Sequence, residues 1–260
     1  GSFAKVKAVK GGCGKIIQPP LFLRFFLPPA AGCATLKENN SGMEVITLVE
    51  RLKFGMYNTY LVRGEKRSVL VDTGSGKEKE SIFEQVRHKN VGLIVLTHGH
   101  IDHVGGTPFL AQRLCVPIAV HKDDYDLLSD NTLRQLFADS FSGKLMKAAS
   151  EQMFHSAKMP AFEPDLFLED GQSLEEYGVD AKVLTLPGHT KGSIGLLMDG
   201  KDLIVGDAMM NLRRPSAALL YEDKLAMEES LQKIRESGAQ MIYPGHGNPF
   251  AASEYFDKVK

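Results

Sequence analysis

Four side chains that can bind metal ions stand within six positions, directly after an apolar run. The run 93–96 (Leu-Ile-Val-Leu) is followed by His98, His100, Asp102 and His103. In an extended backbone, residues two apart point to the same side, so His98 and His100 can bind one ion together. A turn in the next residues would direct Asp102 and His103 elsewhere. The spacing therefore predicts two adjacent ions.

Three further candidate ligands lie later in the chain. His189, Asp207 and His246 each follow an apolar, strand-like run and a glycine. Strand ends along one sheet edge lie close in space, and glycine lets the backbone approach a crowded centre. One such histidine alone is ordinarily structural, but a buried group of seven imidazoles and carboxylates without cations would be costly to desolvate. These groups are the usual donors for zinc and related ions. We predict two divalent ions, most readily zinc, with iron or manganese as alternatives.

Apolar runs rich in β-branched residues predict strands, and periodic apolar patterns predict helices between them. The predicted strands are 44–49, 58–63, 68–72, 92–96, 117–120, 182–186, 194–198, 202–206 and 240–243, and the predicted helices are 78–88, 107–115, 223–237 and 252–259. Strands followed by alternating helices and strands indicate a layered α/β fold in one domain, residues 43–260. The segment 121–165 is helix-like and rich in Met and Phe, so we expect a helical insert that packs as core or covers a site.

Composition limits the classes of partner that we expect for this chain. Residues 43–260 carry 25 Lys and Arg against 31 Asp and Glu, and this acidic balance leads us to expect a small-molecule substrate and no nucleic-acid partner. No apolar run reaches the roughly 18 residues of a membrane span, so we expect no membrane association. Three scattered cysteines without Cys-x-x-Cys spacing favour reduced thiols and a cytoplasmic protein. The sequence leaves the oligomeric state open.

Residues 1–42 differ in character from the rest of the chain. Gly1-Ser2 resembles the pair left after tag cleavage, and clean strand alternation begins only at Met43. We therefore expect residues 1–42 to be an extension added to the natural chain or an upstream segment. A secretory or lipoprotein leader is the alternative, because Ala30-Ala31-Gly32-Cys33 has small residues typical of a cleavage site. Arg24 within the apolar stretch argues against it, although export stays open.

The motif His-x-His-x-Asp-His, followed by separate His, Asp and His residues, resembles the metallo-β-lactamase superfamily over residues 43 to about 250. The resemblance implies an αββα sandwich of two mixed β-sheets flanked by helices, with metals at one edge of the sheets. It implies that His98, His100 and His189 bind the first ion, that Asp102, His103 and His246 bind the second, and that Asp207 bridges them. Asp72, at the end of the predicted strand 68–72, matches a position that supports the ligands from behind.

The resemblance also implies a reaction. Two ions that share a water supply a hydroxide that attacks a carbonyl, and Asp102 can orient or accept the proton as the catalytic residue. The stretches Pro187-Gly188-His189-Thr190 and Pro244-Gly245-His246-Gly247 look most similar to glyoxalase II, a thioester hydrolase. Only 14 residues follow His246, whereas glyoxalase II carries a C-terminal glutathione-binding domain, so we do not expect glutathione specificity.

Other members of the superfamily offer alternatives to a thioester hydrolase. His100 argues against the diiron flavoprotein reductases, which have Glu there, and Asp207 separates the chain from the antibiotic-destroying lactamases. A lactonase or phosphodiesterase of the same superfamily stays open, as does a persulfide dioxygenase with a single iron. Metal content separates these, because two zinc ions favour hydrolysis and one iron with oxygen uptake favours the dioxygenase. A nonenzymatic binding protein is disfavoured because all seven ligands are present.

Overall fold

The computed structural model describes residues 34–38, 44–199 and 201–258. The chain divides into two units, Gly1–Ala31 and Gly32–Lys260, and every described residue belongs to the second unit. Of the expected extension 1–42, residues 1–33 and 39–42 lie outside the described residues, and Ala34–Glu38 forms a strand paired with the next one. The boundary at Met43 stays a prediction.

One sheet gathers strands from the first two thirds of the described chain. Its order is β1 (Ala34–Glu38), β2 (Glu44–Phe54), β3 (Tyr57–Arg63), β4 (Ser68–Val71), β5 (Val91–Val95), β6 (Ile118–Val120) and β7 (Leu166–Phe167). Pairing is antiparallel from β1 to β4 and parallel from β4 to β7. The parallel pairs require crossovers, which include α1 (Lys79–Val86), α2 (Ile101–Val104) and α3 (Thr107–Leu114).

The second sheet comes from the last third of the chain. Its order is β14 (Phe250–Ala251), β13 (Met241–Pro244), β10 (Asp202–Gly206), β9 (Ile194–Met198) and β8 (Ala181–Thr185). The β10–β13 pair is parallel and its other pairs are antiparallel. The remaining regular elements are the hairpin β11 (Met209–Asn211) and β12 (Pro215–Ala217), α4 (Phe141–Ser156), α5 (Lys224–Glu236), α6 (Ser253–Phe256) and four single-turn 3₁₀ helices at Lys122–Asp124, Asp126–Leu128, Asn131–Leu133 and Glu175–Tyr177.

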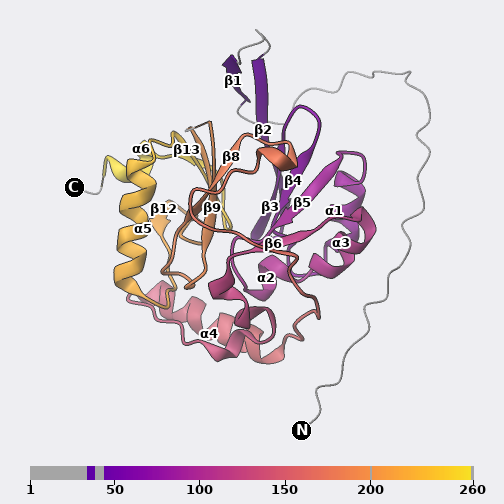
Figure 1. Ribbon diagram of the computed structural model, residues 1–260. Coiled ribbons are helices and arrows are strands. Elements are labelled where there is room, and N and C mark those ends of the chain that lie inside the picture. Colours follow the sequence, from indigo (N-terminus) through magenta and orange to yellow (C-terminus); the bar gives the residue numbers. More distant parts are fainter. Residues whose placement is uncertain (1–33, 39–43, 200, 259–260) are drawn as a thin grey trace. The chain divides into compact units, whose positions relative to one another are not determined.

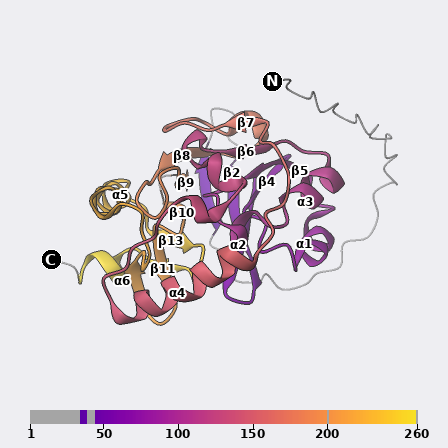
Figure 2. The same ribbon diagram turned by 90° about the horizontal axis from the view of Figure 1, so that it is seen from below.

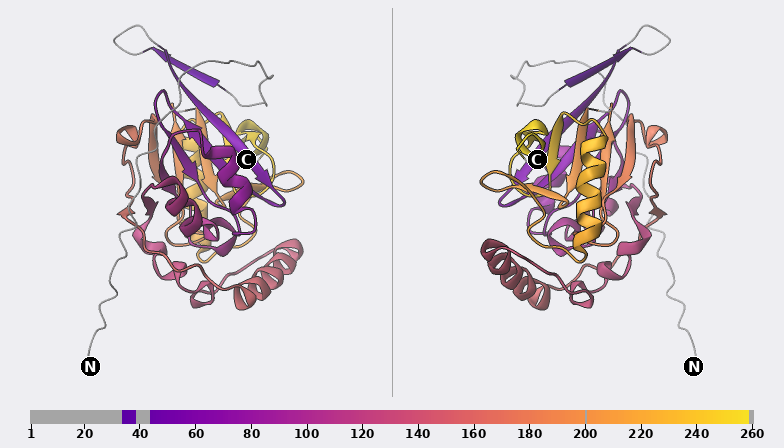
Figure 3. Two further views of the ribbon diagram at one scale, coloured as in Figure 1. Left: turned by 90° about the vertical axis from the view of Figure 1, so that its right-hand side faces the viewer. Right: turned by 90° about the vertical axis from the view of Figure 1, so that its left-hand side faces the viewer.

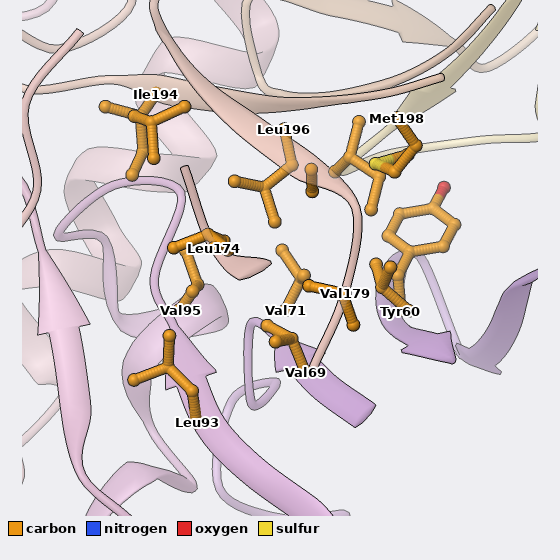
Figure 4. Close-up of a cluster of buried hydrophobic side chains, with 14 of the residues drawn as sticks. Tyr60, Val69, Val71, Leu93, Val95, Leu174, Val179, Ile194, Leu196 and Met198 are labelled. Carbon is orange, nitrogen blue, oxygen red and sulfur yellow. The ribbon is translucent and has the colours of Figure 1, made fainter. Parts of the chain in front are cut away.

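Apolar side chains fill three layers between these elements. Val69, Leu93, Leu196 and Met198 belong to the cluster between the two sheets (Figure 4). A second cluster joins the first sheet to α1 and α3, and a third joins the second sheet to α5 and α6. Figure 3 shows these helices on the outer faces of the two sheets. Because both faces are covered, strands such as β4 are buried throughout. The predicted αββα sandwich is confirmed.

The segment 121–165 is less helical than we expected. Its regular part is α4, and the residues before it form single turns of 3₁₀ helix. Figure 1 shows α4 below the two sheets, and the view from below places it across their end (Figure 2). The predicted helix 252–259 is only the single turn α6. Strands β7, β11, β12 and β14 were not predicted, because two or three residues carry no measurable periodicity.

Two further predictions from the sequence concern the cysteines and the absence of a membrane span. The expectation of reduced thiols is wrong for Cys115, which is disulfide-bonded, so that thiol no longer supports a cytoplasmic location. None of the helices in the described part of the chain combines the length and the apolar character that a membrane crossing needs.

Asp202 gives the fold a measurable pH dependence. Its side chain is 1% exposed at the start of β10, and burial, together with Asp199, raises its pKa to about 6. The folded protein thus binds this proton more tightly than the unfolded chain does, so the stabilisation is complete below pH 4 and is lost as the pH rises through 6. We expect Asp202→Asn to raise the free energy of unfolding by about 2 kcal/mol at pH 8 and to give no gain at pH 4.

Urea unfolding of the unmodified chain and of the Asp202→Asn variant at pH 4 and pH 8 measures this difference in the free energy of unfolding. The exposed Asp257→Asn variant serves as the control and should change stability little at either pH. An equal change in the free energy of unfolding at pH 4 and pH 8 would show that folding does not raise the pKa of Asp202.

Candidate metal centre

All seven predicted ligands lie at one end of the two sheets. His98 follows β5, His100 precedes α2, and Asp102 and His103 lie on α2. His189, Asp207 and His246 follow β8, β10 and β13 of the second sheet. The site is therefore assembled where strands of both sheets end, at the end covered by α4 (Figure 2).

His98, His100 and His189 form the first group of candidate ligands. One nitrogen of each lies within 4.8 Å of the others. His189 Nε2 is 3.1 Å from His100 Nδ1, and the three rings meet edge to face at 4.8–4.9 Å between centroids. His189 Nδ1 donates to the carbonyl of Leu220, which leaves Nε2 directed at the group. Burial, followed by the charge of His189, lowers the pKa of His100 to about 3, so His100 is neutral, as a ligand must be.

Asp102, His103 and His246 form the second group, also within 4.8 Å of one another. His246 Nε2 is 3.3 Å from Asp102 Oδ2 and 3.4 Å from His103 Nε2. Burial alone would lower the pKa of His103, but the carboxylates of Asp207, Asp72 and Asp102 raise it to about 9. This half of the site therefore carries a surplus of negative charge that attracts cations.

Asp207 stands between the two groups. Its Oδ2 lies 3.2 Å from His246 Nε2 and 3.8 Å from His189 Nε2, and its Oδ1 lies 3.5 Å from His103 Nε2. Although burial raises the pKa of this carboxyl, His246 and His103 hold it well below its usual range. Asp207 is thus an ionised carboxylate in contact with members of both groups.

Two atoms in this cluster lack hydrogen-bond partners. His98 Nε2 and Asp207 Oδ1 are buried and accept or donate no hydrogen bond within the described structure. Buried polar atoms are ordinarily satisfied, because an unmade hydrogen bond costs about 1–3 kcal/mol. Imidazole nitrogen and carboxylate oxygen are suitable donors for zinc and for iron. The residues therefore fit divalent metal ions.

Asp72 supports two candidate ligands from behind. Its carboxylate accepts from His103 Nδ1 at 2.8 Å and from both the backbone N–H and the hydroxyl of Thr97 at 2.8 Å. The Thr97 hydroxyl lies 3.1 Å from His98 Nδ1. Asp72 has φ of 61°, a left-handed conformation that Asp adopts more readily than most residues. The contact with His103 orients that ring and raises its basicity.

We expect Asp72→Ala to weaken metal binding by about 10- to 100-fold, because His103 loses its orienting partner. The expected loss is measured by competition with a chromophoric chelator, alongside thermal unfolding to separate it from a loss of fold. Asp72→Asn keeps the shape and one acceptor oxygen, so it should recover part of the affinity. Unchanged metal retention in the alanine variant would refute the role.

Sequence reasoning missed Asp124, which joins the loops that carry His100 and His189. The side chain is fully buried. It accepts from the Gly99 N–H at 2.9 Å, from the Thr190 hydroxyl at 2.7 Å and from the Gly192 N–H at 2.7 Å. Gly99 precedes His100 and Thr190 follows His189, so one carboxylate fixes the backbone beside two candidate ligands.

Asn131 and Arg134 extend this support. Asn131 accepts from the Ile101 N–H and donates to the carbonyl of Gly99, both at 2.8 Å. Arg134 pairs with Asp124 at 3.1 Å and with Glu222 at 3.3 Å. Burial raises the pKa of Glu222 to about 7 despite Arg134. No comparable signal was present in the sequence, because Asp124 lies four residues after the predicted strand 117–120, whereas Asp72 ends the predicted strand 68–72.

A cavity of about 300 Å³ opens beside the ligands. His100, Asp102, His189, Asp207 and His246 line it, together with apolar residues of α4 and with Tyr57 and Lys77. Tyr60 and Tyr243, in contrast to Tyr57, are buried in the core between the sheets. Lys191, two residues after His189, lies 4.0 Å from the carboxylate of Asp123.

Comparison with known proteins identifies the family. The model of the metallo-β-lactamase superfamily matches residues 52–246, and the chain belongs to that superfamily. It is 30% identical over 149 residues to the hydroxyacylglutathione hydrolase GloC of Haemophilus influenzae, covering 56% of this chain and 62% of the relative. It is 27% identical over 221 residues to the acyl-coenzyme A thioesterase MBLAC2 of Bos taurus, covering 76% of each. These relatives agree with the predicted glyoxalase II-like resemblance.

Solved structures agree on the fold. The BLEG-1 B3 metallo-β-lactamase has a TM-score of 0.64 at 20% identity, covering 80% of this chain and 96% of that one. The protein TTHA1623 in a di-iron-bound form has a TM-score of 0.57 at 25% identity, covering 78% and 94%. The chain spans 55% and 62% of the length of the β-lactamase-like protein 2 homologues of Caenorhabditis elegans and Drosophila melanogaster, respectively. It spans 65% of the length of an uncharacterized protein of Aquifex aeolicus.

Proposed function

We propose that the protein is a binuclear metal-dependent hydrolase that cleaves an ester or thioester of a small molecule. The observation that carries this proposal is the pair of adjacent three-residue groups with Asp207 in contact with members of both. The cavity beside them supports a small-molecule substrate. Relatives named as a hydroxyacylglutathione hydrolase and an acyl-coenzyme A thioesterase support a thioester.

The proposed ligands are His98, His100 and His189 for one ion, Asp102, His103 and His246 for the other, and Asp207 for both. Bound divalent ions supply an activated water and a Lewis acid for the carbonyl oxygen. Zinc suits this donor set, and the di-iron form of TTHA1623 makes iron the first alternative.

Asp102 is the proposed catalytic residue. Its side chain lines the cavity and is 15% exposed, and Oδ2 is 3.3 Å from His246 Nε2. The pKa of this carboxyl is lowered, because the charges of His103 and His246 outweigh its burial, so Asp102 is an acceptor. It can orient the attacking water and receive its proton at Oδ. His246 Nδ1 donates to the carbonyl of Met56 at 2.9 Å, which fixes the neighbouring ring.

Elemental analysis followed by a substrate panel tests the proposal. The purified full chain is expected to bind two equivalents of zinc or iron and to hydrolyse thioesters faster than lactones, phosphodiesters or β-lactams. His100→Ala should abolish this activity, and activity that survives the substitution would overturn the mechanism. One iron per chain with oxygen uptake on a persulfide would instead identify a dioxygenase.

A further inference from the structure

We propose that the group cleaved by this enzyme is an apolar acyl group of medium length, held between α4 and the candidate metal centre. This inference rests on the hydrolase function proposed above and adds the class of substrate. It comes from the chemistry of the cavity, which is lined by apolar residues of α4 on one side and by the exposed Lys77 elsewhere.

The wall on the side of α4 is apolar except for Ser150. Met146, Ala149 and Met153 all line the cavity, and their spacing of three and four residues places them on one face of the helix. Leu136 and Leu220 continue this wall. Methionine side chains are flexible and polarizable, so they adapt to alkyl chains of different shape. A cavity of about 300 Å³ is at the lower end for small-molecule sites, which limits the length of the chain.

The apolar wall reaches the candidate ligands themselves. The ring of Phe154 lies 4.8 Å from that of His100, tilted by 31°, and Phe154 is only 9% exposed. The carbons next to the scissile carbonyl would therefore already contact apolar atoms. A charged or strongly polar acyl group would lose its hydration there without gaining a partner.

The polar groups of the cavity do not replace the hydration that a polar acyl group would lose there. The hydroxyls of Tyr57 and Ser75 lie 2.7 Å apart, and Ser75 donates to Glu78 at 3.0 Å. These hydroxyls therefore already have partners. Apart from the candidate ligands, the polar residues left on the cavity wall are Lys77 and Ser150. Recognition of the acyl part is thus left to apolar contact.

Positive charge is present beside the cavity instead. Lys77 lines the cavity and is exposed, and the exposed Arg213 and Arg214 directly follow Leu212, another lining residue. None of these three cations pairs with a carboxylate in the described part of the chain. Unpaired cations beside a cavity attract anions. The leaving part of the substrate should therefore carry phosphate or carboxylate groups.

A chain-length series on one anionic thiol tests the acyl assignment. The metal-loaded full chain is assayed with acetyl, hexanoyl and decanoyl thioesters of coenzyme A. We expect kcat/KM to rise at least about tenfold from the acetyl to the hexanoyl thioester, because each buried methylene contributes to binding in the cavity. Met153→Gln should lower the hexanoyl-to-acetyl ratio at least about fivefold. Leu145→Gln, a 67% exposed position of α4 outside the cavity, is the matched control and should leave the ratio unchanged.

The outcomes separate this inference from the function on which it rests. Equal hydrolysis of all three thioesters, unchanged by Met153→Gln, would overturn the apolar acyl site and leave the hydrolase intact. If no thioester is cleaved, calorimetry with S-hexyl coenzyme A, a thioether that cannot be hydrolysed, decides the matter. Binding that Met153→Gln weakens would retain the acyl site and overturn the thioesterase function, and absence of binding would overturn both.

Discussion

Replacing Asp207 with alanine is expected to lower kcat/KM by at least about 1,000-fold and to reduce the bound metal from two equivalents to one or fewer. Asp207 is the carboxylate that contacts His189 of the first group and both His103 and His246 of the second. Its removal therefore takes a ligand from both proposed ion sites. It also removes a negative charge beside His103 and His246 of the second group.

Elemental analysis and steady-state kinetics on the same preparation measure the two effects. Asp139→Ala is a suitable control, because Asp139 is an exposed carboxylate that pairs with Lys224 away from the ligands. That variant should bind two equivalents and retain activity. An Asp207→Ala protein with two tightly bound ions and normal turnover would rule out the bridging role.

The second large effect is expected from Gly245→Ala, a change of one methyl group. A Cβ at Gly245 would lie 2.2 Å from Asp207 Oδ1 and 2.7 Å from His103 Cε1. The backbone cannot move away easily, because the Gly245 N–H donates to Gly206 at 2.7 Å and its carbonyl accepts from Asn58 at 2.8 Å. Asp207 and His103 must therefore shift, and we expect loss of at least one metal equivalent and about a 100-fold or greater loss of activity.

Gly238→Ala separates this effect from the general cost of replacing glycine. Gly238 has φ of 72°, and no atom lies within 4 Å of the position that an added Cβ would take, so its substitution strains the backbone without touching the ligands. It should lower stability by about 1 kcal/mol and leave metal content unchanged. Equal metal content in the two alanine variants would contradict the steric argument.

The ligand positions were predictable because each one is marked locally. His189, Asp207 and His246 each follow a strand and a glycine, and a strand end can be recognised from a few neighbouring residues. The structure brings these side chains together with the cluster 98–103, as the layered fold required. Asp72 was found from the resemblance to the superfamily, which has an Asp after a buried strand, and its contact with His103 gives it a defined place in the site.

The supporting network could not be predicted in the same way. Asp124 contacts residues 25 and 66–68 positions away, so its role depends on how the segment after β6 folds back over the site. Nothing in the local sequence fixes that path, because three single turns of 3₁₀ helix have no strong periodicity. The same holds for Asn131 and Arg134. The helix-like character of residues 121–165 predicted a helical insert but could not show that the methionines of α4 line the cavity beside the ligands.

The segment between β6 and β7 has two parts that are attached to the protein by different forces. Residues up to Arg134 are held by buried hydrogen bonds and ion pairs to the ligand loops. In contrast, the side-chain hydrogen bonds of α4 stay within the helix or its own cap, and Phe154 joins it to the rest through apolar contact. The parts that we propose to hold the metal ions and to select the substrate are therefore attached to the protein separately. We expect a chimaera that exchanges residues 140–158 for another helix to retain metal binding and to change its substrate preference, whereas an exchange beginning at residue 121 should lose both.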